Sequence, residues 1–231
     1  MQQNILAISI IISSLFLATS LEVTNTIPEQ ITFTRKNFNK DNPTELFKLF
    51  VSYPEADGID EEDRHEINLG IQQVMTQSIA DFKEEMRTLQ SRSAELTYGV
   101  FNFDYLVTFN SDQLVSVQFQ KDIDFGDRYG KKTHILTFNY NLSAKRRVHP
   151  NTIFSKEASF GNEIYNLLKG KAQNFKPDPK RMFDKFTLTN EYLVFYFDET
   201  NSNTAEINEI RLLWLEVQHL LSEKSDGLIF K

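Results

Sequence analysis

The sequence predicts an α+β fold, in which one long and one shorter helix cover mainly antiparallel sheet. First, residues 62–91 carry apolar side chains at three- and four-residue steps, which is typical of an amphipathic helix. Second, several runs on both sides of this segment alternate apolar and polar residues, as half-buried strands do. Third, Tyr192 to Asp198 (YLVFYFD) is apolar on both strand faces. Such a strand is central, so we expect a helix over one face and a second layer over the other.

The N-terminal segment predicts export from the cell. Residues 1–20 contain no charged side chain, and residues 5–17 are apolar apart from three serines. The small residues of Ala18-Thr19-Ser20 suit a signal peptidase, which would cleave before Leu21. We therefore expect a cleaved signal peptide, a periplasmic or secreted bacterial protein and no membrane contact after cleavage. The alternative is that the apolar segment is retained as an anchor.

Charge and cysteine content limit the possible functions. The net charge is -7 and the isoelectric point is near 5.2. Nucleic acid is therefore not expected as a partner, because phosphate binding needs a basic surface. A basic partner is compatible with this charge, and so is a role in solubility alone. The chain has no Cys, which excludes disulfides, thiolate zinc sites and Cys nucleophiles.

The first half, residues 21–110, is expected to contain the long helix. Short strands are predicted at residues 31–34 and 46–53, separated by a break at Asn42-Pro43. Residues 54–63 (PEADGIDEED) predict an acidic loop that caps the helix. A long alternating strand is expected at residues 98–110.

The second half, residues 111–231, continues with a turn and a half-buried strand whose polar face carries Ser116, Gln118 and Gln120. The remaining predictions are an acidic loop at 122–129, a strand at 134–142, a basic turn at 145–147, the shorter helix at 159–174, a connector at 175–185, a hairpin of 186–189 with 192–198, and a segment at 210–221 that begins as strand and ends as helix.

Motifs for chemistry are scarce, and no catalytic residue, metal ligand or cofactor is predicted. The sequence has no serine-nucleophile signature, no phosphate loop and no His pair at the spacing of zinc ligands on one helix. Asp122, Asp124 and Asp127 could supply paired carboxylates for glycoside hydrolysis. A hydrolase could instead use a metal held with His134. The simpler interpretation of these acids is a solvated hairpin loop.

Three segments in order resemble a known family. They are LVSVQF (114–119), FNYNLSAKRRVHPNTIF (138–154) and FTLTNEYLVFYFD (186–198), and VSYPEA (51–56) with Ile67-Asn68 fits upstream. Together they resemble the RsiV-like family, which includes the extracellular domain of the RsiV anti-sigma factor and the N-terminal region of the peptidoglycan deacetylase PdaC. The resemblance covers most of residues 28–221 and implies a two-part α+β fold with a role at the cell envelope.

RsiV-like domains bind lysozyme, so the resemblance implies a non-enzymatic binding module for lysozyme, another wall-active protein or peptidoglycan. The residues expected to contact the partner are Asp122, Asp124, Asp127, Tyr129 and His134. The turn before the 134–142 strand matches the family only at Gly130 and His134, and residues 198–208 lack its usual Pro and Gly. The alternatives are a hydrolase that acts on peptidoglycan and a membrane-anchored structural protein of the envelope.

Overall fold

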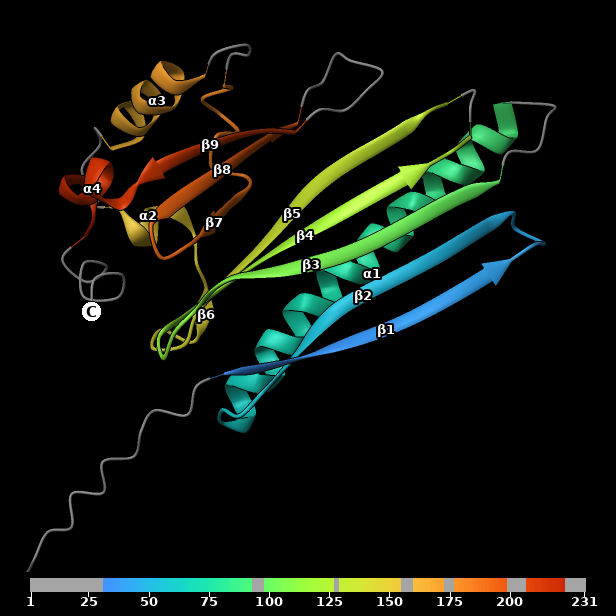
Figure 1. Ribbon diagram of the computed structural model, residues 1–231, viewed down its shortest axis with the longest axis horizontal. Helices are drawn as coiled ribbons and strands as arrows, with labels where there is room; N and C mark the ends of the chain where they lie inside the picture. Colours follow the sequence, from blue (N-terminus) through green and yellow to red (C-terminus); the bar gives the residue numbers. More distant parts are fainter. Residues whose placement is uncertain are drawn as a thin grey trace, which may run out of the picture.

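The computed structural model describes residues 31–92, 98–126, 129–154, 160–172, 177–198 and 207–222. The predicted signal peptide, residues 1–20, lies outside these ranges. The described residues form a six-stranded sheet and a three-stranded sheet with covering helices (Figure 1), which confirms the α+β prediction. None of the described helices is both long enough and apolar enough to span a bilayer.

The larger sheet has its strands in sequence order, β1 to β6. The strands are β1 (Thr32–Asn42), β2 (Phe47–Asp57), β3 (Gly99–Asn110), β4 (Leu114–Asp124), β5 (Lys131–Asn141) and β6 (Arg146–Arg147). Neighbouring strands are antiparallel except β2 and β3, which are parallel and are joined through the long helix α1 (Glu61–Arg92). A parallel pair needs such a crossover connection, because a short turn cannot reverse the chain twice.

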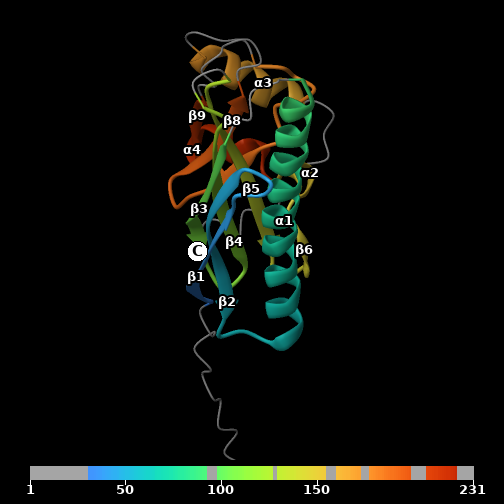
Figure 2. The same ribbon diagram turned by 90° about the vertical axis from the view of Figure 1, so that its right-hand side faces the viewer.

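Helix α1 lies along one face of this sheet (Figure 2). Its apolar stripe includes Ile67, Ile71 and Phe82, all fully buried, and the ring of Phe82 contacts Phe101 of β3 at 5.2 Å. The helix begins after Asp60, whose side chain accepts a hydrogen bond from the backbone N–H of Asp63 at 3.1 Å. This is the N-terminal cap that the acidic sequence predicted.

The smaller sheet contains β7 (Phe186–Leu188), β8 (Tyr192–Asp198) and β9 (Ile207–Leu213), with β8 in the centre. The remaining helices are α2 (Pro150–Ile153), α3 (Phe160–Lys171), α4 (Trp214–Val217) and the 3₁₀ helix η1 (Gln218–Leu220). Leu193, Phe195 and Phe197 of β8 pack into a core with residues of α3. Val194 and Tyr196, on its other face, pack against Ile135 of β5. Both faces of β8 are therefore covered, as predicted.

A buried polar network joins the two sheets. The hydroxyl of Ser116 donates to Asn139 Oδ1 at 2.6 Å and accepts the backbone N–H of Leu188 at 3.0 Å. The side-chain amide of Asn139 donates to the carbonyl of Phe186 at 2.8 Å. The hydroxyl of Tyr196 donates to Gln118 at 3.0 Å. The prediction that this polar face of β4 is open to solvent was wrong at Ser116, because the smaller sheet covers it.

The predicted bounds of the two acidic loops were also wrong. Strand β4 continues through Asp124, so the predicted acidic loop at 122–129 begins inside a strand. Similarly, β2 runs to Asp57, and only three residues separate it from α1. Charged side chains do not end a strand whose alternate residues, such as Ile123, remain buried. The two halves into which the sequence was divided, residues 21–110 and 111–231, meet in the turn that joins β3 to β4 within one sheet.

Candidate binding groove

Two of the sequence-predicted partner residues, Asp122 and Asp124, lie on the face of β4 that is turned away from α1. Asp122 accepts hydrogen bonds from Thr133 at 2.7 Å and from Gln120 at 2.9 Å. Asp124 accepts the backbone N–H of Gly126 at 2.8 Å and lies 3.4 Å from the ammonium of Lys131. Both carboxylates thus have polar partners within their own hairpin.

His134 lies on the opposite face of the same sheet. His134 of β5 is the strand partner of Lys121 of β4. Lys132, two residues before His134, forms an ion pair with Glu85 of α1. Since alternate residues of a strand share a face, His134 is on the α1 side, away from Asp122. The structure therefore does not bring this imidazole together with the acids of β4.

The turn between β4 and β5 holds the remaining predicted residues. Tyr129 is half-buried against the core beneath α1, and its backbone N–H donates to the carbonyl of Gly126 at 3.2 Å. Gly126 and Gly130 both have a positive φ, which glycine adopts without strain. Asp127 lies outside the described residues.

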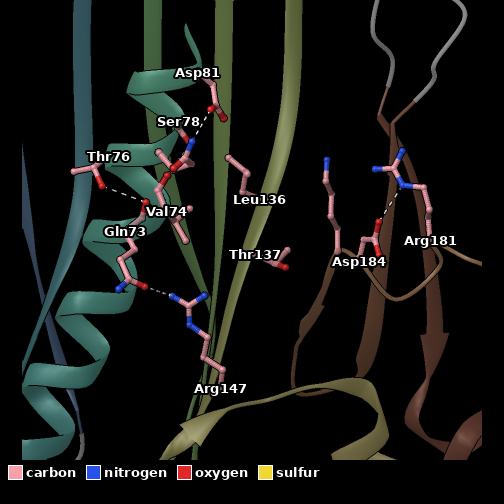
Figure 3. Close-up of a pocket in the computed structure, with 12 residues that line it drawn as sticks. Gln73, Val74, Thr76, Ser78, Asp81, Leu136, Thr137, Arg147, Arg181 and Asp184 are labelled. Atoms are coloured by element: carbon pink, nitrogen blue, oxygen red, sulfur yellow. Dashed lines mark hydrogen bonds and ion pairs between the residues drawn. The ribbon is translucent and has the colours of Figure 1, made fainter. Parts of the chain in front are cut away.

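A groove that the sequence did not predict runs between α1 and the outer edge of β5 (Figure 3). Its volume is about 590 Å³, within the usual range of ligand sites. One wall is the polar flank of α1, where Gln73, Gln77 and Asp81 follow one another at four-residue steps. Leu136 and Thr137 of β5 line the groove between this wall and the connector that precedes β7.

Arg147 of β6 lies at one end of the groove. Its guanidinium donates to Gln73 Oε1 at 3.0 Å and to the carbonyl of Gly70 at 3.4 Å, and it stacks over the ring of Phe138 at 5.3 Å. In the described part of the chain, no carboxylate forms an ion pair with Arg147. The side chain is thus held in place by neutral groups, and no described carboxylate neutralises its positive charge.

The second wall is formed by the connector, from which Arg181, Asp184 and Lys185 line the groove. Arg181 Nε donates to Asp184 at 3.0 Å, so these two charges compensate each other. Gln77 donates to Asp81 at 2.7 Å on the facing wall. The lining thus contains three cations and two carboxylates, although the whole chain carries a charge of -7.

A smaller cavity of about 250 Å³ shares Gln73 and Arg147 with the groove and extends it towards Tyr140. The hydroxyl of Tyr140 donates to the buried carboxylate of Asp63 at 3.1 Å. Burial and this hydrogen bond raise the pKa of Tyr140. Burial is also the main cause of the raised pKa of Asp63, with a smaller contribution from its neighbour Asp60.

The edge of β5 along the groove has backbone groups that face outward. Strand β6 pairs only with Tyr140 and Asn141. The carbonyl of Asn139 accepts Val148 N–H on this outer side, whereas Leu142 N–H bonds to Gln113 on the β4 side. Because the direction alternates along an antiparallel strand, the N–H and C=O of the odd-numbered residues before Asn139 also point outward.

The side chains that line the groove can bind polar groups. The groove offers amides, hydroxyls and guanidinium groups, all of which form hydrogen bonds, and an unneutralised charge at Arg147. Within the described ranges, no three His, Asp or Glu side chains converge as a metal site would require. The sequence showed residues 145–147 as a basic turn, but it could not show that this turn meets the flank of α1.

Comparison with known proteins finds solved structures of the same fold. No family profile matches the sequence, and no curated protein matches it. Two crystal structures of DUF3298 family proteins share the fold. The protein from Bacteroides fragilis has a TM-score of 0.61 and 12% identity, over 87% of this chain and 97% of that one. The protein from Pseudomonas aeruginosa has a TM-score of 0.52 and 10% identity, over 86% and 96%.

Proposed function

We propose that this protein is an exported, non-enzymatic binding module of the cell envelope, of the RsiV-like kind. The observation that carries the proposal is the groove between α1 and β5, whose Arg147 is fixed by neutral contacts and has no carboxylate partner among the described residues. Polar side chains that converge on an open groove are what a binding site requires.

Lysozyme is the first partner to test. The RsiV-like resemblance implies it, and a chain of charge -7 attracts a basic protein over long distances. In this proposal the overall charge accelerates the encounter, whereas the groove supplies close contacts. Another wall-active protein or peptidoglycan itself is the second possibility that the resemblance implies.

The test is calorimetric titration of residues 21–231 with a c-type lysozyme near physiological salt, together with an assay of lysozyme activity. We expect binding at micromolar concentration or tighter and a loss of lysozyme activity. Binding that disappears with modest added salt would reveal charge attraction alone and would contradict the proposal for lysozyme. Sedimentation with purified peptidoglycan tests the polymer as the partner, and failure in both experiments would exclude lysozyme and peptidoglycan and leave another wall-active protein as the partner to seek.

A further inference from the structure

The edge of β5 from Lys132 to Phe138 has the length of a site for one extended strand, and the groove opens onto this edge at Leu136 and Thr137. Lys132 of β5 contacts Glu85 of α1 at one end, and Phe138 contacts Gly70 and Arg147 at the other. Strand and helix therefore run in opposite directions along the groove. The seven residues from Lys132 to Phe138 span about 20 Å. A bound peptide of about six to eight residues would fill this length.

Backbone groups are available along the whole edge. Thr133, Ile135 and Thr137 direct their N–H and C=O away from β4, as deduced above from the bonds of Asn139 and Leu142. On the side away from β4, no described strand pairs with this part of β5. Exposed edges of this kind bind extended peptides by adding a strand to the sheet.

The charges in the groove select the side chains of such a strand. Arg147 shares the α1 side of the sheet with its strand partner Tyr140, and its charge has no carboxylate partner within the described ranges. Lys185 contributes a further positive charge on the facing wall, beside the Arg181–Asp184 pair. Guanidinium groups bind carboxylates in short charge-assisted hydrogen bonds.

We propose that the β5 edge of the groove binds an extended, carboxylate-bearing segment of a partner protein as an additional strand. A carboxylate of this segment pairs with Arg147, and its backbone forms the hydrogen bonds that β5 leaves unused. This inference rests on the proposed function in one respect, namely that the groove is the binding site. It goes further by specifying the chemistry of the segment and its mode of binding.

The test uses the whole protein and a fluorescein-labelled octapeptide of alternating Glu and Val, with binding followed by fluorescence anisotropy. A peptide of alternating Lys and Val is the charge control. Two further peptides are N-methylated, one at every Glu and the other at every Val. Only alternate residues of an added strand bond to the edge, so methylation should weaken binding roughly tenfold in one peptide and little in the other.

Two protein variants locate the site. Arg147→Gln should weaken binding of the Glu peptide roughly tenfold, whereas Arg87→Gln, which changes an exposed arginine of α1 outside the groove, should leave it unchanged. Thr137→Pro removes an N–H that points away from β4, so the variant should fold and lose the peptide. Circular dichroism melting checks that each variant is folded. If Thr137→Pro is unfolded, the two methylated peptides still test whether the peptide binds as an added strand.

Several outcomes would overturn the inference. Equal binding of the two methylated peptides would exclude strand addition, and equal binding of the Lys peptide would exclude carboxylate recognition. Capture of soluble peptidoglycan fragments with no binding of the Glu peptide would assign the groove to a glycan instead. Lysozyme binding that persists in Arg147→Gln without any peptide binding would overturn this inference and leave the proposed function standing.

Discussion

Gly70 is the residue on which the close approach of α1 to β5 depends. A Cβ built at this position would lie 2.3 Å from the ring of Phe138. The same ring supports Arg147 at the end of the groove. A glycine in the middle of a helix is unfavourable on its own, so its presence here is explained by the space that the ring occupies.

Gly70→Ala should therefore lower the free energy of unfolding by about 1–2 kcal/mol, because the cost of overpacking exceeds the helical preference of alanine. Urea denaturation measures this change. Gly170→Ala in α3 is the matched control, since a Cβ there meets nothing within 4 Å. Equal stability of the two variants would contradict the tight packing at Gly70.

Asp63 predicts a specific dependence of stability on pH. The residue is 5% exposed, and burial raises the pKa of its carboxyl above the ordinary value of 3.8. The folded state therefore binds this proton more tightly than the unfolded state does. The contribution of Asp63 to stability is greatest below pH 3.8 and is lost as the pH rises through the raised pKa.

Asp63→Asn removes this titration and retains an oxygen that can accept the Tyr140 hydroxyl. The stability of the variant relative to the natural protein should rise as the pH increases from about 4 to 7. Urea titrations at several pH values measure the difference. The pKa values of Asp57 and Asp60 are lowered, so these carboxylates act below pH 3.8, outside this window. If the difference in free energy of unfolding between Asp63→Asn and the natural protein does not vary with pH, the prediction is contradicted.

At the scale of the elements, β8 is the strand that holds the smaller sheet in place. Phe195 has no exposed surface, and its ring contacts Phe183 and Phe186 at centroid distances of 6.1 and 6.4 Å. Phe195→Ala should lower the free energy of unfolding by about 3–5 kcal/mol, because it leaves a large cavity. Leu215→Ala is the control, since Leu215 is 78% exposed. A loss below about 1 kcal/mol for Phe195→Ala would contradict its central position.

The same strand shows what the sequence could predict. Six consecutive large apolar residues require cover on both faces, and this requirement can be read locally. The polar face of β4 has no such local signal, because the burial of Ser116 depends on partners distant in the chain, among them Asn139 and Leu188. Polar side chains on a strand are compatible with both water and a buried network, so alternation alone predicted solvent there.

The groove escaped prediction for a related reason. Its walls come from the flank of α1, the basic turn at Arg147 and the connector near Arg181, which are more than 30 residues apart in the chain. Each looked like an ordinary solvated segment by itself. The predicted partner residues lie close together in sequence, but strand alternation places His134 and Asp122 on opposite faces.

For the whole molecule, the buried network at Ser116 predicts that the two sheets unfold together. The only Trp of the chain, Trp214, is buried beside the smaller sheet, whereas α1 covers the larger one. Trp fluorescence and helical circular dichroism should therefore report coincident urea transitions.

Ser116→Ala removes the hydroxyl that bonds Asn139 and the N–H of Leu188. Both transitions should shift together. The free energy of unfolding should fall by about 1–3 kcal/mol, because buried polar groups are left unpaired. Thr76→Ala is the control, because its exposed hydroxyl bonds only to carbonyls of its own helix. Movement of the fluorescence transition alone would mean that the sheets are separate folding units.

The parallel pairing of β2 with β3 also has a consequence for the order in which the protein folds. The hairpins β1–β2 and β4–β5 join residues that are close in the chain, so they can form within microseconds. Phe47 and Gly99, in contrast, pair across a long stretch of chain that contains α1. Closing so long a connection is slow. The docking of the β1–β2 hairpin beside β3 is therefore the expected rate-limiting step, and substitutions at this seam should slow refolding more than they accelerate unfolding.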